Sequence, residues 1–481
     1  MAAVGMFFAG RQHDTTDYFL GRRGLPWWAI LLSIVATETS ALTVISVPGL
    51  AATTNLTFIQ LGFGYLVGRI GVAYLLLPGY FEGTQDTAYQ RLERRFGPGA
   101  RRAASGVFLV TRSLADAVRV FATAIPLAVI THWSIPVGIL ATGVITLAYT
   151  WFGGMRAVVW TDVLQLGVYI LGGVATLVVA LHMAGGVGAL GTAYDHYKLV
   201  FLDFGFSFTR TYTLWGGLIG GALLSAASHG TDQLIVQRLL SARGLSDARK
   251  ALIGSGVFIV FLFALFLLVG TSLWLTGTAQ PGGSGDQIYP TFVVNHLPSG
   301  LAGLVVAGLL AAAMGTHASA INSLASAATN DFYAPLTGER DPAQLLRVGR
   351  IMTIVWAVVL VVGAMLFPDP RKPVVELALK VASLTYGALL GTYILGGFWS
   401  RARQRDVIVA MIVGIVVMIP VIFAARLGAW LDNPRILTTL SSLAWPWDVP
   451  LGTAVTVLVG MASSMIGRVE GWNDGKKTAM M

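Results

Sequence analysis

A cluster of polar side chains interrupts an otherwise apolar segment near the start of the chain. The segment runs from Trp27 to Leu50, and Thr37, Glu38, Thr39 and Ser40 lie at its middle. An ionisable residue at the depth of a lipid bilayer is costly, so it usually pairs with another charge or lines a pathway. Helices in lipid break only where the freed backbone groups border a cavity. The cluster therefore predicts a broken helix beside a binding site.

A second interrupted segment lies near the middle of the chain. It runs from Thr213 to Gly230 and carries glycine pairs followed by Ser225, Ser228 and His229. Interrupted segments at corresponding positions of two halves indicate an inverted-repeat transporter with its site at the membrane midplane. Small residues also let helices pack closely, so for this segment the packing interpretation stays open beside the functional one.

The segment from Leu301 to Ala328 is rich in small and hydroxyl side chains. Ala312, Thr316 and Ser319 are spaced i, i+4 and i+7, which places them on one face of a helix. Hydroxyls together with the carbonyls of a broken helix could supply the oxygens that a dehydrated monovalent cation needs. Alternatively, these hydroxyls bond back to their own helix backbone.

Charged residues inside apolar segments are the other candidates for chemistry. They include Glu38, Arg112, Asp116, Arg119, Asp162 and Lys380. Arg112 and Asp116 are spaced i, i+4, and Asp116 and Arg119 are spaced i, i+3, so one helix can pair its own charges. We expect Arg112 to pair structurally with Asp116. Arg119 is the candidate to bind either a substrate carboxylate or Glu38, because a guanidinium makes bidentate bonds to carboxylates.

Three roles remain open for Glu38. It could be a counter-ion for Arg119 or Lys380, a direct ligand for a substrate amine or hydroxyl, or a proton acceptor coupled to transport. His317 could likewise replace sodium by carrying a proton, or it could be a hydrogen-bonded packing residue. Lys380 lies one turn after Glu376, so a local ion pair is the alternative to a substrate role.

These residues must be positioned by membrane-spanning helices. A bilayer core of about 30 Å needs about 20 apolar helical residues to cross it, and the chain offers about twelve such segments. They run from Trp27 to Leu50, Phe58 to Tyr80, Ala103 to Ile130, Ile135 to Phe152, Val158 to Ala184, Thr213 to Gly230, Leu252 to Leu275, Leu301 to Ala328, Met352 to Phe367, Val374 to Trp399, Val407 to Leu427 and Leu451 to Ile466. The apolar residues 1–10 could be part of one more, truncated helix.

Composition agrees with a membrane protein. Of 481 residues 55% are hydrophobic and 11% charged, which is too little polar surface for a soluble globule of this size. The 32 Lys and Arg residues lie mostly in alternate short loops, which places the loop from Asp14 to Gly24 and the C-terminus in the cytoplasm of a cell-membrane protein. The charge is therefore a topology signal and does not indicate nucleic-acid binding. The loops leave no room for a further soluble domain, so residues 1–481 form one membrane domain.

Several enzyme classes are disfavoured by the residues that the sequence lacks. The absence of cysteine excludes disulfides, thiolate metal sites and cysteine nucleophiles. The sequence also has no GxSxG, HExxH or phosphate-binding loop. We therefore expect a protein that is not an enzyme.

Four stretches, in order along the chain, resemble the sodium:solute symporter family. They are Leu25 to Trp28 at the entry to the first segment, Gly153 to Gln165 with Thr161 and Asp162, Asp232 to Leu239, and Asn330 to Tyr333. The resemblance implies an all-α integral membrane protein with a five-plus-five inverted repeat of the leucine-transporter type. Repeat one would cover about 25–184, repeat two about 213–399, and trailing helices about 405–468. It also implies a monomer that couples Na⁺ influx to solute uptake by alternating access.

The resemblance also implies site residues. The principal sodium site would use carbonyls of Ala36, Thr39 and Ala312 and two consecutive hydroxyls, at positions that read Gly315 and Thr316 here. A second ion would use Asp162 with Ser319. The substrate cavity would be lined by Thr43, Ser225, Ser228, His229 and Lys380, together with Glu38 and Arg119.

Two features determine the function that we expect. The missing hydroxyl at Gly315 concerns the coupling ion, and the small polar residues of the cavity concern the solute. We expect Na⁺ symport of a small carboxylate or amino-acid-like solute rather than a sugar. Proton coupling through Glu38 or His317, or a sensor that keeps the fold without transport, are the alternatives.

Overall fold

The computed structural model describes residues 12–39, 41–131, 133–278, 285–366, 374–432 and 434–478. Within these ranges, side chains are described except at 41–42, 122, 125–126, 128–130, 149, 374–381, 426 and 467–478. The described residues form helices and no strand; a single bridge joins Leu25 to Ala242. Residues 1–10, predicted to be a truncated helix, lie outside the described residues.

The first half of the chain contains the helices that correspond to the first five predicted segments. They are α2 (Thr15–Leu20), η1 (Gly21–Arg23), α3 (Trp27–Glu38), α4 (Ala41–Thr53), α5 (Ile59–Gly71), η2 (Val72–Leu76), η3 (Leu77–Tyr80), α6 (Gln90–Phe96), α7 (Pro98–Thr131), α8 (Ile135–Met183), η4 (Val187–Ala189) and α9 (Leu190–Asp195).

The second half continues with the remaining helices. They are η5 (Gly216–Gly220), α10 (Gly221–Gly230), α11 (Gln233–Leu240), α12 (Leu245–Leu275), α13 (Gly285–His296), α14 (Ser299–Ala327), η6 (Ala328–Tyr333), α15 (Ala334–Thr337), α16 (Pro342–Met365), α17 (Val374–Phe398), α18 (Gln404–Ile422), α19 (Ala424–Trp430), α20 (Arg435–Ser441), η7 (Trp445–Trp447) and α21 (Asp448–Thr478).

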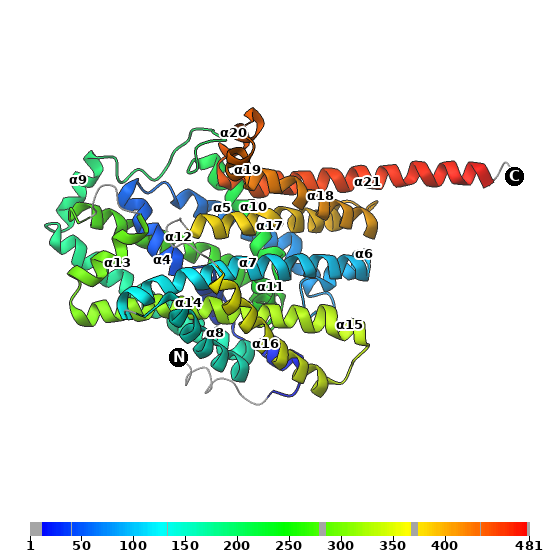
Figure 1. Cartoon of the computed structure of the whole chain (residues 1–481), viewed down its shortest axis with the longest axis horizontal. Helices are drawn as coiled ribbons and strands as arrows, with labels where there is room; N and C mark the ends of the chain where they lie inside the picture. Colours follow the sequence, from blue (N-terminus) through cyan, green and yellow to red (C-terminus); the bar gives the residue numbers. More distant parts are fainter. Residues whose placement is uncertain are drawn as a thin grey trace.

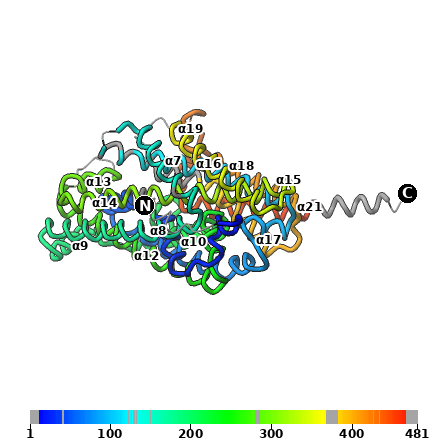
Figure 2. The backbone as a smooth tube through the Cα atoms, turned by 90° about the horizontal axis from the view of Figure 1, so that it is seen from below, coloured from blue at the N-terminus to red at the C-terminus, as the bar shows by residue number. Residues whose placement is uncertain are grey.

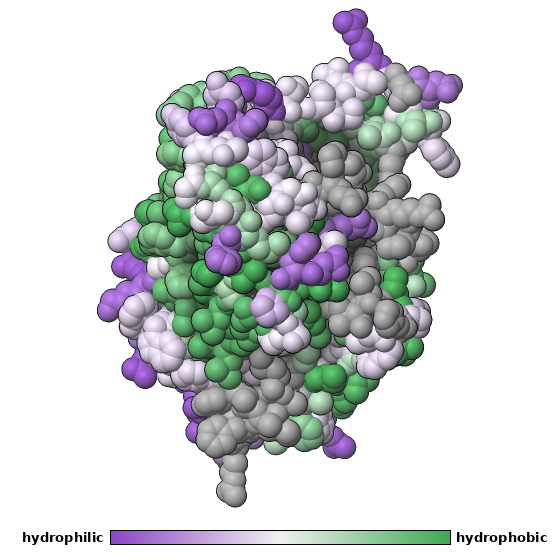
Figure 3. Space-filling view, turned by 90° about the vertical axis from the view of Figure 1, so that its left-hand side faces the viewer, coloured by the Kyte–Doolittle hydropathy of each residue, from purple (hydrophilic) through white to green (hydrophobic). Residues whose placement is uncertain are grey.

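The long helices lie side by side and form one elongated bundle (Figures 1 and 2). Helices α9 and α13 lie at one end of the bundle, while α6 and α15 lie at the other end, where α21 extends beyond the rest. Large apolar side chains such as Phe261, Leu171 and Leu458 are exposed on the flanks of the bundle, as expected for surfaces that face lipid. Seen from the end that carries α9 and α13, hydrophilic and hydrophobic residues are mixed (Figure 3).

The predicted break in the first segment is present. Helices α3 and α4 are bent by 61° relative to each other, and Thr39 follows α3 with non-helical backbone angles. The second interrupted segment is also irregular, because the π-helical turn η5 precedes α10. Its glycines allow close packing as well: a Cβ built on Gly217 would lie 2.7 Å from the carbonyl oxygen of Gln60 in α5. Packing and interruption therefore coexist in this segment.

The fourth and fifth predicted segments are joined in one long helix, α8, whose helical backbone is interrupted at one residue. In α8, Gly154 has φ 53° and ψ −152°, and a Cβ built there would lie 2.4 Å from the carbonyl oxygen of Tyr18. Only glycine tolerates both conditions without strain. This break separates the part of α8 that begins at Ile135 from the part that carries Asp162.

The number of spans is only partly tested by length and composition. Seven helices among the described residues are long and apolar enough to cross a membrane, or eight when the bent pair of α3 and α4 counts as one span. The other predicted segments are short, interrupted or incompletely described. The prediction of about twelve spans therefore stays a prediction, while the multi-pass helical architecture is clear.

Candidate functional site

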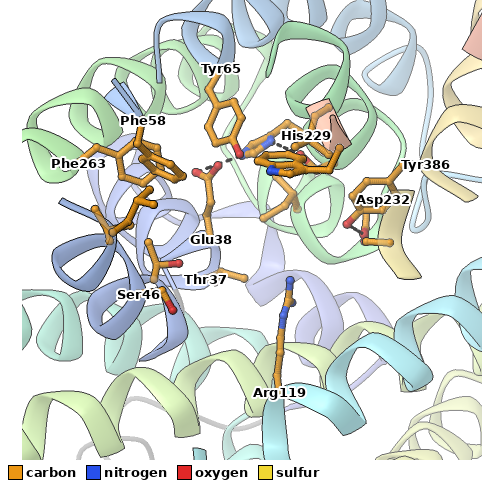
Figure 4. A pocket seen from close by; sticks show the side chains of 18 of the residues that line it. Thr37, Glu38, Ser46, Phe58, Tyr65, Arg119, His229, Asp232, Phe263 and Tyr386 are labelled. Atoms are coloured by element: carbon orange, nitrogen blue, oxygen red, sulfur yellow. Dashed lines mark hydrogen bonds and ion pairs between the residues drawn. The ribbon is translucent and has the colours of Figure 1, made fainter. Parts of the chain in front are cut away.

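A cavity of about 330 Å³ lies against the bend between α3 and α4. Its polar lining includes Thr37, Glu38, Thr43, Ser46, Arg112, Arg119, Ser228, His229, Asp232 and Tyr386. Phe58 and Phe263 supply an aromatic wall on one side, and Asp232 and Tyr386 lie on the opposite side (Figure 4). An apolar cavity with a few convergent polar groups is the usual form of a small-molecule site.

The cavity extends toward the end of the bundle that carries α13. Gly285 and Asp286, at the start of that helix, belong to its lining. In the other direction it reaches Asp232, which precedes α11. A solute in the cavity would therefore lie between these two acidic residues.

Most residues predicted to contact substrate line this cavity. Glu38, Thr43, Arg119, Ser228 and His229 all do so. Ser225 is not among the lining residues; it is buried, and its hydroxyl accepts a hydrogen bond from Arg69 Nε at 3.4 Å. Lys380 belongs to α17, but its side chain lies outside the described residues, so its predicted role is not tested.

Glu38 has a partner that the sequence did not indicate. Its carboxylate accepts a hydrogen bond and ion pair from Arg69 of α5, whose side chain is fully buried. Arg69 also donates to Ser255 Oγ of α12 at 2.7 Å. His229 Nε2 lies 3.8 Å from the same Glu38 oxygen. The carboxylate at the helix break is therefore tied to α5, and its counter-ion is Arg69 rather than Arg119, one of the two counter-ions considered from the sequence.

Arg119 shares its carboxylate partner with another arginine. Arg112 donates to both oxygens of Asp116, with the Nη2 to Oδ1 distance at 3.0 Å, as the i, i+4 spacing predicted. Arg119 Nη1 donates to Asp116 Oδ1 at 3.0 Å. The shared carboxylate leaves guanidinium donors of Arg119 directed into the cavity, where its side chain extends from α7 (Figure 4).

Asp232 joins three helices at the end of the cavity opposite α13. Its Oδ2 accepts a hydrogen bond from the Tyr386 hydroxyl of α17 at 2.8 Å and lies 3.5 Å from Arg112 Nη1 of α7. Its Oδ1 accepts from the backbone N–H of Leu234 at 2.8 Å and so caps the N-terminus of α11. Asp232 therefore connects the cavity with α11, the helix that follows α10.

Of the residues predicted for the principal sodium site, Ala36 and Thr39 lie beside the same bend, and Ala36 shares a buried cluster with Ala312 of α14. Ala36 is buried near the end of α3, and Thr39 is fully buried, with no hydrogen bond to its hydroxyl from the described residues. In α14, Thr316 Oγ1 donates to the Ala312 carbonyl at 3.1 Å, which is the backbone-bonding alternative raised by the sequence. The hydroxyl oxygen of Thr39 therefore has lone pairs that no donor among the described residues occupies.

Two other oxygens occupy the place of the hydroxyl that Gly315 lacks. A Cβ built on Gly315 would lie 2.1 Å from Gln165 Oε1 and 2.9 Å from Asp162 Oδ1. Both atoms are buried and have no hydrogen-bond donor among the described residues. Buried polar atoms are rarely left unpaired unless a ligand, an ion or water completes them. The glycine therefore makes room for a carboxamide and a carboxylate oxygen.

A guanidinium lies between the two residues predicted for a second ion. Asp162 Oδ2 accepts from Ser33 Oγ at 2.6 Å and pairs with Arg238 Nη2 at 3.0 Å. The same Arg238 nitrogen donates to Ser319 Oγ, and Ser319 in turn donates to the Gly315 carbonyl. A cation at Asp162 and Ser319 would have to share this position with Arg238.

His317 is buried next to α7 and away from the main cavity. It lines a cavity of about 10 Å³ together with Asp116, Arg119 and Thr316. Its Nε2 has no hydrogen-bond partner among the described residues. His317 therefore contacts the arginine side of the site rather than the Glu38 side.

Sequence reasoning missed Arg69, Gln165, Arg238, Asp232 and Tyr386 as parts of the site. One signal could have indicated Arg69: a carboxylate within a span needs a buried cation, and Arg69 is one of the few inside an apolar segment. No signal in the sequence indicates that Gln165 lies beside Gly315 of α14.

Comparisons with known proteins show the family of the chain. A family model described as sodium:solute symporter family matches residues 18–414. The human sodium-coupled monocarboxylate transporter 1 is 27% identical over 438 residues, covering 89% of this chain and 72% of its own length. The sodium/sialic acid symporter SiaT of Proteus mirabilis is 28% identical over 442 residues, covering 90% and 88%.

Solved structures confirm the predicted fold class. A substrate-bound, outward-open structure of a Na⁺-coupled sialic acid symporter superposes with a TM-score of 0.85 at 26% identity, covering 97% of this chain and 95% of that one. Mhp1, a nucleobase-cation-symport-1 family transporter, has a TM-score of 0.59 at 14% identity and covers 95% of each chain, which supports the fold alone. The all-α leucine-transporter-type fold expected from the sequence is thus confirmed.

Proposed function

Because the chain belongs to the sodium:solute symporter family, we propose that the solute it carries with Na⁺ is a small carboxylate bound by Arg119. The chain is a multi-pass membrane transporter that couples Na⁺ to solute movement, and it is not an enzyme. Sodium is therefore the co-transported ion, as the sequence led us to expect. The identity of the solute and the residues that bind it are the parts proposed here.

One observation carries the carboxylate proposal. Arg119 reaches into the cavity, and its side chain is 20% exposed while that of its partner Asp116 is 1% exposed. Arg112 already donates to both oxygens of Asp116. A carboxylate in the cavity would pair with the unused donors of Arg119, and such charge-assisted bonds are stronger than neutral ones.

The solutes named for similar proteins point in the same direction. The relatives cited above are named for monocarboxylates and sialic acid, and a further human relative, 28% identical over 428 residues, is the sodium/iodide cotransporter. All of these solutes are anions. Glu38 is already neutralised by Arg69, so it does not repel an anion as a free carboxylate would.

For the ion, the proposed ligands combine the predicted set with two further side chains. Carbonyls of Ala36, Thr39 and Ala312 and the hydroxyl of Thr316 would bind Na⁺ with Gln165 Oε1 in place of the hydroxyl absent at Gly315. The unpaired state of Gln165 Oε1 and Asp162 Oδ1 supports this assignment. Oxygen ligands of this kind suit a hard monovalent cation.

Replacing Gln165 by leucine is expected to raise the Na⁺ concentration needed for half-maximal uptake by about tenfold, the effect of losing one polar ligand. The double variant Gln165→Ala/Gly315→Ser should recover part of this loss, since it restores a hydroxyl and removes the carboxamide that a Cβ would meet at 2.1 Å. Uptake measured against Na⁺ concentration distinguishes the variants. An unchanged Na⁺ dependence in Gln165→Leu would exclude this residue as a ligand.

For the topology and the oligomeric state, we propose the arrangement that the sequence predicts. Repeat one covers about 25–184, repeat two about 213–399, and the trailing helices about 405–468, within a monomer in the cell membrane. The C-terminus and the loop before α3 lie in the cytoplasm, since basic residues collect on that side.

A stabilisation assay tests the proposed solute class. Purified protein is heated with lactate, pyruvate or sialic acid, or with lactamide and pyruvamide as uncharged controls, each with and without Na⁺. The proposal predicts that at least one acid raises the midpoint of unfolding in Na⁺, and that its amide does not. Equal stabilisation by acid and amide would contradict it.

A further inference from the structure

A second cavity lies at the opposite end of the bundle from α13. It measures about 390 Å³ and is formed by the irregular end of the second span, by α6 and by the end of α17. Three arginines of α6 line it, namely Arg91, Arg94 and Arg95, while Glu82 supplies the carboxylate of the described lining. This cavity is separate from the solute cavity, since the two share no described lining residue.

The three arginines are bonded to neutral acceptors. Arg91 donates to the Leu76 carbonyl, Arg94 to the carbonyls of Glu82 and Thr84, and Arg95 to those of Gly396, Trp399 and Ser400. Among the described residues, none of the three forms an ion pair with a carboxylate. The guanidiniums are therefore held in place by the backbone while their charge remains uncompensated at close range.

The mouth of this cavity opens beside exposed apolar and aromatic side chains. Tyr74 and Leu75, which also line the cavity, are 59% and 60% exposed on the outside of the second span. Arg249 lies over the Tyr74 ring, with its Cζ 5.0 Å from the ring centroid, and adds a further cation beside the mouth. Basic pockets between helices at the cytoplasmic side suit the head groups of anionic lipids.

We propose that this cavity binds the phosphate head group of an anionic glycerophospholipid. The arginines of α6 would contact the phosphate, and the acyl chains would lie along the exposed surface of Tyr74 and Leu75. Arginine is suited to phosphate because its fork of N–H donors matches the geometry of the phosphate oxygens. The proposed positive-inside orientation places the site in the cytoplasmic leaflet, where the anionic lipids are concentrated.

One aromatic residue, Tyr80, connects this second cavity to α10, the helix that also carries residues of the solute cavity. Arg91 lies over the Tyr80 ring, with its Cζ 5.3 Å from the ring centroid. The Tyr80 hydroxyl donates to the carbonyl of Gly230, the last residue of α10. A head group bound to Arg91 would thus fix the end of the second span against the end of α10.

Lipid binding to the full-length protein tests the proposal. Detergent-purified protein is titrated with phosphatidylglycerol or with phosphatidylcholine, and bound lipid is counted by native mass spectrometry. Phosphatidylglycerol should bind more tightly to the wild type. Arg94→Gln should weaken that binding by about fivefold, whereas Glu82→Gln should strengthen it by a similar factor, because it removes the competing charge.

Opposite effects of the two variants separate binding from misfolding. The Glu82 carboxylate is exposed and accepts no hydrogen bond from the described residues, so Glu82→Gln leaves the fold intact. Arg102→Gln, an exposed arginine of α7 outside the cavity, is the matched control and should bind lipid as the wild type does. Equal affinity for the two lipids, or no response to either variant, would overturn the proposal. So would displacement of the lipid by inorganic phosphate or glycerol phosphate at millimolar concentration, because the site would then serve a soluble anion.

Discussion

Replacing Arg119 by glutamine is expected to lower the affinity for a carboxylate solute by about 100-fold. The estimate takes a charge-assisted interaction as worth about 3 kcal/mol, and each 1.4 kcal/mol as about a factor of ten. Arg119 shares the Asp116 carboxylate with Arg112, so Asp116 would keep Arg112 as its partner in the variant. Binding is measured as the solute-dependent rise in the unfolding midpoint in saturating Na⁺.

Two further variants make the Arg119 result specific. Arg119→Lys should retain part of the affinity, because it keeps the charge but loses the bidentate geometry. Arg102→Gln removes a charge from the same helix outside the cavity and should leave binding unchanged. If Arg119→Gln bound the acid as tightly as the wild type, Arg119 would not be the carboxylate ligand.

Replacing Glu38 by glutamine is expected to destabilise the protein by about 3–5 kcal/mol. The change removes the negative charge that compensates the buried Arg69 guanidinium, whose other acceptors are the neutral hydroxyls of Ser225 and Ser255, and an uncompensated buried charge has a cost of this order. The free energy of unfolding in detergent, from chemical denaturation, measures the effect. Transport should fall together with stability, because the pair links α5 to the end of α3.

The double variant Glu38→Leu/Arg69→Met separates a structural role from a direct role in coupling. Replacing a buried ion pair by apolar residues of similar size is often neutral or stabilising, so stability should return to near that of the wild type. Recovery of uptake as well would identify Glu38 as the counter-ion of Arg69. Recovered stability with abolished uptake would contradict that role and would favour a direct contact between Glu38 and the solute.

The helix breaks could be predicted from the sequence because they depend on local composition. The polar cluster at Thr37 to Ser40 predicts the interruption between α3 and α4, and the i, i+4 spacing of Arg112 and Asp116 predicts their ion pair. In both cases the relevant atoms are a few residues apart, so helix geometry alone determines whether they meet.

The pairings between distant segments could not be predicted. Glu38 pairs with Arg69, which was not among the partners considered from the sequence, and Asp162 pairs with Arg238 across a large separation in sequence. Helix periodicity shows which face of a helix is polar, but it does not show which neighbour that face meets. The same limit applies to Gln165, whose proximity to Gly315 depends on the contact between α8 and α14.

The central claim is that Na⁺ drives the uptake of a carboxylate bound at Arg119. Its most direct test is uptake of a radiolabelled acid, selected by the stabilisation assay, into proteoliposomes with an inward Na⁺ gradient. The account predicts accumulation above equilibrium only while the Na⁺ gradient is present, inhibition by the unlabelled acid but not by its amide, and loss of accumulation in Arg119→Gln. Accumulation that is indifferent to the Na⁺ gradient, or unchanged by Arg119→Gln, would contradict the claim.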